Sequence, residues 1–60
     1  MITYYIIRTA DGAEYWAWES AQKAREALRR FIDGGLLTDG QVFALRLNTL
    51  TDQFTVTEET

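Results

Sequence analysis

The chain of 60 residues contains no cysteine, no histidine and no proline, and Ser20 is its only serine. Small domains often depend on disulfides or a bound metal ion, because a short chain buries little apolar surface. Disulfides require cysteine, and transition-metal sites draw mainly on cysteine, histidine and carboxylates, so neither kind of support is expected here. The missing cysteines leave the redox compartment of the protein open.

The same absences argue against an enzyme. Nucleophilic catalysis needs an activated serine, cysteine or threonine beside a base, and Ser20 is better explained as a helix cap. Carboxylates carry acid–base chemistry when burial shifts their pKa, but the acidic residues here lie mostly in predicted turns, helix ends and the tail. A phosphate-binding glycine loop precedes a helix, whereas Gly34-Gly35 follows one. We therefore expect a non-enzymatic protein with no catalytic, cofactor-binding or metal-binding residues.

Long apolar runs and an excess of positive charge are also missing. No stretch approaches the roughly 20 apolar residues of a membrane-spanning helix, and the first residues lack the basic and apolar segments of a signal peptide. A soluble, cytoplasmic protein with no membrane partner is the default expectation. The net charge of −3 disfavours nucleic acid as a partner.

The chain is nevertheless 47% hydrophobic and 13% aromatic, which predicts a packed core rather than disorder. Its length predicts a single domain over residues 1–60. Two β-rich segments, residues 1–8 and 13–18, flank Asp11-Gly12. This dipeptide predicts a hairpin with a type I′ turn, which needs positive φ at both central residues. The expected opposite pairs are Ile7 with Trp16 and Tyr5 with Trp18.

A helix is predicted over residues 20–33. Ser20 is a suitable N-cap, apolar residues recur at helical spacing, and Gly34 is placed to end the helix in the left-handed conformation. Residues 41–47 and 53–57 are predicted strands joined by a turn. The expected fold is α+β with the element order ββαββ, in which one helix packs across one face of a four-stranded sheet.

One helix covers one face of a sheet, so the other face should be exposed. The small side chains Ala21, Ala24 and Ala27 would admit large partners, and we therefore place the large strand residues beneath the helix. This predicted core consists of Tyr5, Ile7, Trp16, Trp18, Phe43, Leu45, Leu47, Phe54 and Val56. The predicted outer face carries Ile2, Tyr4, Ile6, Tyr15, Ala17, Val42, Ala44, Arg46, Thr55 and Thr57.

The segment Phe54-Thr55-Val56-Thr57-Glu58 resembles the closing strand of the immunoglobulin-binding domains of protein G, and Thr3-Tyr4 and Ile7 echo that family's first strand. Those domains are ββαββ units of similar length, with a ubiquitin-like grasp of one helix by a four-stranded sheet. The resemblance implies the strand order 2-1-4-3, with parallel terminal strands in the centre. Residues 13–18 and 41–47 would then form the edges.

The resemblance does not extend to the family's antibody contacts. Leu45 stands at the position of a contact tryptophan, and Arg29 and Arg30 replace Lys, Gln and Asn on the helix. Immunoglobulin binding is therefore one of the less favoured functions.

We predict a protein–protein interaction module or inhibitor that binds a protein partner through an exposed sheet face or edge strand. Exposed apolar patches often mark contact sites, and residues 13–18 lack the Lys or Pro that blunts sheet edges. By analogy, small proteins of this kind are often phage or mobile-element inhibitors. The candidate contact residues are Tyr4, Ile6, Tyr15, Ala17, Arg46 and Thr55.

Three alternatives remain open at this point. The exposed face could form a homodimer, or the chain could be a designed or redesigned ββαββ scaffold. Residues 20–33 contain four basic and two acidic residues, against two basic and seven acidic elsewhere. This basic ridge is a secondary candidate site for nucleic-acid phosphates, although a solvated helix face is the simpler interpretation. The ridge consists of Lys23, Arg25, Arg29 and Arg30.

Overall fold

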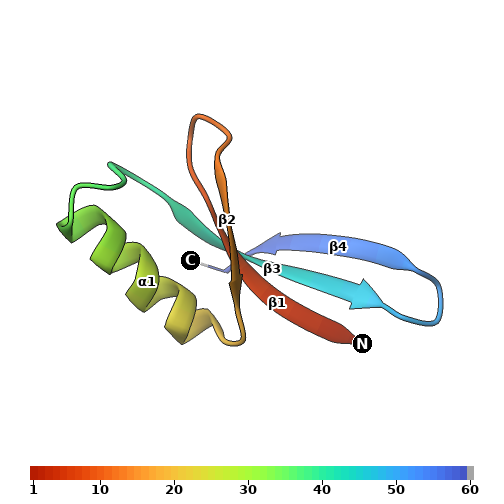
Figure 1. The fold of residues 1–60 in the computed structure, drawn as a ribbon. Helices are drawn as coiled ribbons and strands as arrows, with labels where there is room; N and C mark the ends of the chain where they lie inside the picture. The colour runs from red at the N-terminus through yellow and green to blue at the C-terminus, as the bar shows by residue number, and fades with distance from the viewer. Residues whose placement is uncertain (60) are drawn as a thin grey trace.

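The computed structural model describes residues 1–59, which form an antiparallel four-stranded sheet and one helix (Figure 1). The element order ββαββ and the α+β class are as predicted. In chain order the elements are β1 (Ile2–Arg8), β2 (Glu14–Trp18), α1 (Ala21–Asp33), β3 (Gln41–Asn48) and β4 (Gln53–Glu58).

The order of the strands across the sheet is β2-β1-β3-β4, so the predicted order 2-1-4-3 is wrong. The neighbour of β1 is β3 and not the predicted β4. β3 is antiparallel to β1 over seven residue pairs. The edges of the sheet are therefore β2 and β4. The physical reason lies in the side chains beneath the helix: β3 offers Val42 and Ala44, whereas the same face of β4 carries Thr55 and Thr57, whose hydroxyls are costly to bury without partners.

The turn of the first hairpin is longer by one residue than predicted. The Thr9 N–H donates to the Ala13 carbonyl at 2.9 Å, and the Gly12 N–H donates to the Thr9 carbonyl at 3.1 Å. Of the turn residues, Gly12 alone has positive φ, at 92°, whereas a type I′ turn would need Asp11 there too. The arrangement is the common three-residue hairpin loop with a left-handed glycine at its end.

The longer turn shifts the register of β2. Ile7 lies opposite Tyr15 instead of the predicted Trp16, but a bulge then restores the predicted pair of Tyr5 with Trp18. Tyr15 and Trp18 consequently face the helix, and Trp16 is 58% exposed. The predictions that Trp16 lies in the core and Tyr15 on the outer face are therefore wrong.

The helix begins and ends with caps encoded in the sequence. The Ser20 Oγ accepts a hydrogen bond from the Lys23 N–H at 3.1 Å, as expected of an N-cap. At the other end the Leu36 N–H donates to the Phe31 carbonyl at 2.8 Å, and Gly35 has φ of 79°. These bonds define a Schellman motif, in which the residue after the C-cap takes the left-handed conformation. Gly34 is the C-cap, so the left-handed residue is Gly35 and not the predicted Gly34.

The core lies between α1 and one end of the sheet. Ile7, Val42, Ala24 and Ala27 are fully buried there. The rings of Tyr15 and Trp18 contact that of Phe31, with centroids 5.9 and 6.2 Å apart. The helix presents alanine to the sheet and lies close to it, so the smaller residues of β3 fit beneath it. The prediction that the core contains Phe43, Leu45, Leu47, Phe54 and Val56 is therefore wrong.

The helix is too short to cover the whole sheet. Thirteen residues span about 20 Å, whereas the molecule measures 40 × 22 × 16 Å. Within residues 1–59, α1 contacts β1, β2 and β3 but not β4. Figure 1 shows β4, the start of β1 and the end of β3 projecting away from α1. We call this projection, residues 2–4, 45–48 and 53–58, the arm.

Candidate functional site

The arm carries a regular array of apolar side chains on the sheet face opposite the helix. Residues directly across an antiparallel pair lie on the same face, with Cβ atoms about 5 Å apart. The pairings of β1, β3 and β4 therefore assemble two rows of three residues. We call this array the outer patch; its rows are Ile2, Leu47 and Phe54, and Tyr4, Leu45 and Val56.

The outer patch is open to solvent. The side chains of its two outer strands are 42% (Ile2), 46% (Tyr4), 65% (Phe54) and 45% (Val56) exposed, and the central Leu45 and Leu47 are half-buried. A contiguous exposed apolar surface on a small protein is unusual and often marks a contact site.

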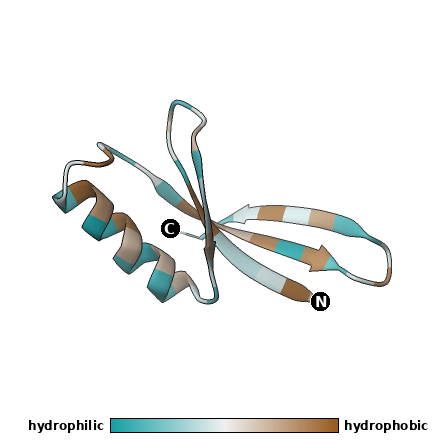
Figure 2. Ribbon diagram, viewed as in Figure 1, coloured by the Kyte–Doolittle hydropathy of each residue, from teal (hydrophilic) through white to brown (hydrophobic). Residues whose placement is uncertain are grey.

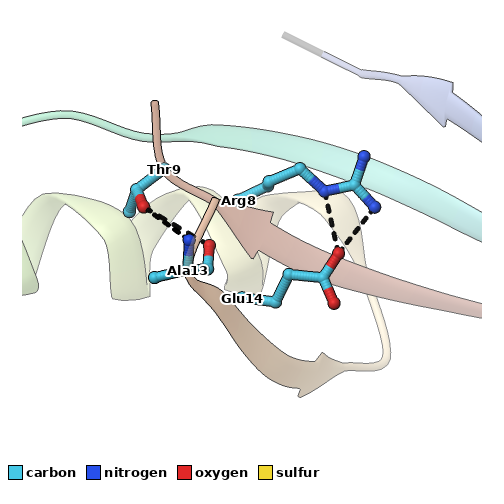
Figure 3. Close-up of polar contacts among 4 residues, drawn as sticks. All are labelled: Arg8, Thr9, Ala13 and Glu14. Atoms are coloured by element: carbon cyan, nitrogen blue, oxygen red, sulfur yellow. Dashed lines mark hydrogen bonds and ion pairs between the residues drawn. The ribbon is translucent and has the colours of Figure 1, made fainter. Parts of the chain in front are cut away.

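Charged residues border the outer patch on the side nearer the first hairpin. The next row along the strands is Ile6, Phe43 and Glu58. The Arg8 guanidinium lies 4.9 Å from the centre of the Phe43 ring, and its Nη2 is 2.7 Å from the Glu14 carboxylate (Figure 3). These groups form a polar rim beside an apolar centre, as in protein interfaces.

The opposite face of the arm is polar. Thr3, Arg46 and Thr55 form one row there, and the Arg46 Nη2 lies 3.3 Å from the Glu59 carboxylate. Figure 2 shows hydrophobic and hydrophilic residues alternating along β3 and β4. The two faces of the arm therefore differ in chemistry, and only the outer one is apolar.

The structure does not bring the six predicted contact residues together. Tyr4 and Ile6 lie on the outer face, but Ile6 is only 1% exposed. Tyr15 packs against the helix, and Ala17 is exposed within the β2 bulge. Arg46 and Thr55 form a pair on the face opposite Tyr4. The reason is that β3 and β4 turn toward the helix side the face that was predicted to point away from it. Tyr4 alone of the six belongs to the outer patch.

Sequence reasoning missed four members of the outer patch because it placed them beneath the helix. Their alternation with Arg46, Thr55 and Thr57 was visible in the sequence. The lengths of the elements do not reveal that the helix leaves them uncovered, because a helix of 13 residues spans about 20 Å and a strand of eight residues about 26 Å. The four missed residues are Leu45, Leu47, Phe54 and Val56.

The two edges of the sheet differ in how they are protected. β2 is five residues long, contains the bulge and begins with the charged Glu14, and these are features that blunt an edge. β4 is exposed along all six residues and pairs with β3 in regular register. The edge predicted for partner contact, residues 13–18, is thus the better protected one, and the open edge is β4.

The first hairpin turn contains Asp11, a carboxyl group whose pKa is shifted by its hydrogen bonds. The Thr9 hydroxyl donates to the Asp11 carboxylate. It also accepts from the Ala13 N–H at 3.1 Å (Figure 3). The hydrogen bond from Thr9, with a smaller contribution from the Ala13 N–H, lowers the pKa of Asp11 below its ordinary 3.8. Asp11 is exposed, and its bonds fix the turn without forming a reactive site.

The predicted basic ridge is an exposed face of α1. Its four residues, Lys23, Arg25, Arg29 and Arg30, are all exposed. The Arg29 Nε lies 4.0 Å from the Asp33 carboxylate, and both side chains are largely solvated. This geometry suits a solvated helix surface.

Among residues 1–59, no three carboxylates gather closely enough to hold a metal ion. Over the same range the helix falls short of the length and apolarity that crossing a membrane requires. No protein-family model matches the chain, and no curated protein or solved structure matches it.

Proposed function

We propose that this protein is a non-enzymatic protein–protein interaction module whose contact surface is the outer patch. The observation that carries the proposal is the array of six apolar residues on the uncovered face of the arm. Burial of such a surface is favourable by roughly 25 cal/mol for each Å² removed from water. A protein partner supplies the complementary apolar surface.

The surroundings of the outer patch support recognition of a protein. Interfaces combine an apolar, aromatic centre with a polar rim. Here Glu58 lies in the row next to Tyr4, Leu45 and Val56, and the Arg8–Glu14 ion pair lies beyond that row, with Arg8 over the Phe43 ring. The open edge of β4 adjoins the patch and is available for the addition of a partner strand. A surface that binds proteins needs no catalytic group, in keeping with the lack of histidine and cysteine.

The test compares two matched variants of the same strand as baits for capture from an extract of the source cells. Phe54→Thr removes the most exposed aromatic ring of the outer patch and replaces it with a β-branched residue that favours a strand. Thr55→Val changes the neighbouring residue on the polar face to one of the same shape. We expect a protein that the wild-type and Thr55→Val baits retain and that the Phe54→Thr bait loses. Equal retention by all three baits, or none by the wild type, contradicts the proposal.

A further inference from the structure

The arm is a single layer of sheet. Stable domains are built from at least two packed layers around an apolar core, and sheets pack face to face at about 10 Å. At the helix end α1 supplies the second layer, whereas on the arm the described chain supplies none. The missing layer belongs on the outer face, because the polar row of Thr3, Arg46 and Thr55 is suited to water.

Resting on the function proposed above, we infer that the second layer is another copy of this chain, packed outer patch against outer patch about a twofold axis. A twofold contact uses the same surface on both copies, so that surface must be compatible with itself. The six residues of the outer patch carry no charge, and a copy placed on them brings no like charges together at the centre.

The area of the outer patch is at the lower limit for such a contact. From the exposed fractions of its residues, the patch presents about 500 Å² of apolar surface on each chain. With the whole patch covered, two copies together would bury about 1,000 Å², which is the size that a specific interface should reach and is below the roughly 1,200 Å² at which stable interfaces begin. The buried share is roughly a tenth of the 4232 Å² surface of the chain, which is the usual proportion for a small protein. An interface of this size is weak and depends on concentration.

Pairing of two copies through the open edge of β4 is the alternative geometry, and the charges oppose it. A register centred on Thr55 brings Glu58 to Asp52, in the turn that precedes β4 of the second copy, and the two like charges repel each other there. A register centred on Val56 places Glu58 opposite Phe54. Both registers also leave the outer patch in water, whereas face-to-face packing covers it.

The experiment measures the molar mass of the purified protein alone by light scattering and sedimentation, from micromolar to millimolar concentration. We expect a monomer–dimer equilibrium in this range. Phe54→Thr should weaken dimerisation by at least about 30-fold, as for a residue at the centre of an interface, and Val56→Thr should weaken it by about 10-fold. Thr55→Val on the opposite face should leave the dissociation constant unchanged within about 2-fold.

Folding of each variant is checked by circular dichroism at a concentration where the wild type is monomeric. A wild type that stays monomeric at millimolar concentration overturns the second copy as the partner. A dimer that persists in both Phe54→Thr and Val56→Thr also overturns the inference, because such a dimer must use another surface. The proposed interaction function is tested separately, by the capture experiment, and it survives either result if that experiment still yields a protein whose retention depends on Phe54.

Discussion

β1 and β3 run through both ends of the sheet, yet the two ends differ in their exposure to water. At the helix end Ile7 and Val42 are 0% exposed, whereas on the arm all six residues of β4 are exposed. β1 contributes an isoleucine to each end, Ile7 beneath α1 and Ile2 on the arm. The two isoleucines lie on opposite faces of β1: α1 covers Ile7, whereas no second layer of the described chain lies over Ile2 at the end of the arm. Stability should therefore reside at one end and recognition at the other.

The largest expected effect comes from making the same substitution at both ends. Ile7→Ala removes buried methyl groups and leaves a cavity, and should lower the free energy of unfolding by about 3 kcal/mol. Ile2→Ala, on the same strand but 42% exposed, should lower it by less than about 1 kcal/mol. Urea denaturation of both variants at low protein concentration measures the difference.

Ile7→Ala can leave the chain unfolded, since a domain of this size has little stability to lose. In that case Ile7→Val, which should cost about 1 kcal/mol, replaces it, with Ile2→Val as the partner. Equal losses at the two positions would mean that the arm contributes to the stability of the monomer as much as the core does.

A smaller effect is expected at the start of the helix. Ser20→Ala removes the hydrogen bond to the Lys23 N–H and should cost about 1 kcal/mol. Ser20→Thr retains the hydroxyl and should cost little. Hydrogen exchange separates the two ends: Ser20→Ala should speed exchange of amides in α1 and the strands beneath it, with less change in β4, which α1 does not contact. Faster exchange in β4 alone would contradict this division.

The smallest effect is expected at the first turn, which lies beyond the helix-covered end. The Thr9 hydroxyl and the Ala13 N–H lower the pKa of Asp11 below 3.8, so the carboxylate stabilises the folded state above that pH. This contribution is lost as the pH falls through the lowered pKa. An NMR titration of the Asp11 carboxyl should give a higher pKa in Thr9→Val than in the wild type. Identical values in both would show that the hydroxyl does not hold the carboxylate.

The secondary structure followed from the sequence because its signals are local. Ser20 before a run of good helix formers, the glycines at 34 and 35, and Asp11-Gly12 between two β-rich segments each act within a few residues. The helix and the four strands accordingly lie within a residue or two of their predicted bounds. The pairing of Tyr5 with Trp18 was also predicted.

The sequence did not predict which faces of β3 and β4 point toward the helix, because the packing surface of α1 decides this and lies outside those two strands. Both alternating sets in β3 are apolar at several positions, with Val42 and Ala44 on one side and Phe43 and Leu45 on the other. Large residues in the core are the usual expectation, but the alanine face of α1 lies close to the sheet and selects the small set. The predicted contact residues depended on which face of β3 points to the helix. Arg46 and Thr55 share the face of Ala44, so they do not lie beside Tyr4 as predicted.

The bulge in β2 has a consequence for how this chain can change in length. The longer turn shifts β2 by one residue and the bulge at Trp16-Ala17 shifts it back, so the strand holds one residue more than its pairing with β1 requires. Deleting either bulge residue would leave a regular alternation that keeps Tyr15 and Trp18 toward α1. A deletion at residue 13 or 14 would instead turn Tyr15 to the other face. Insertions and deletions accepted during evolution should therefore gather at Trp16-Ala17, where the chain can lose a residue without losing its core.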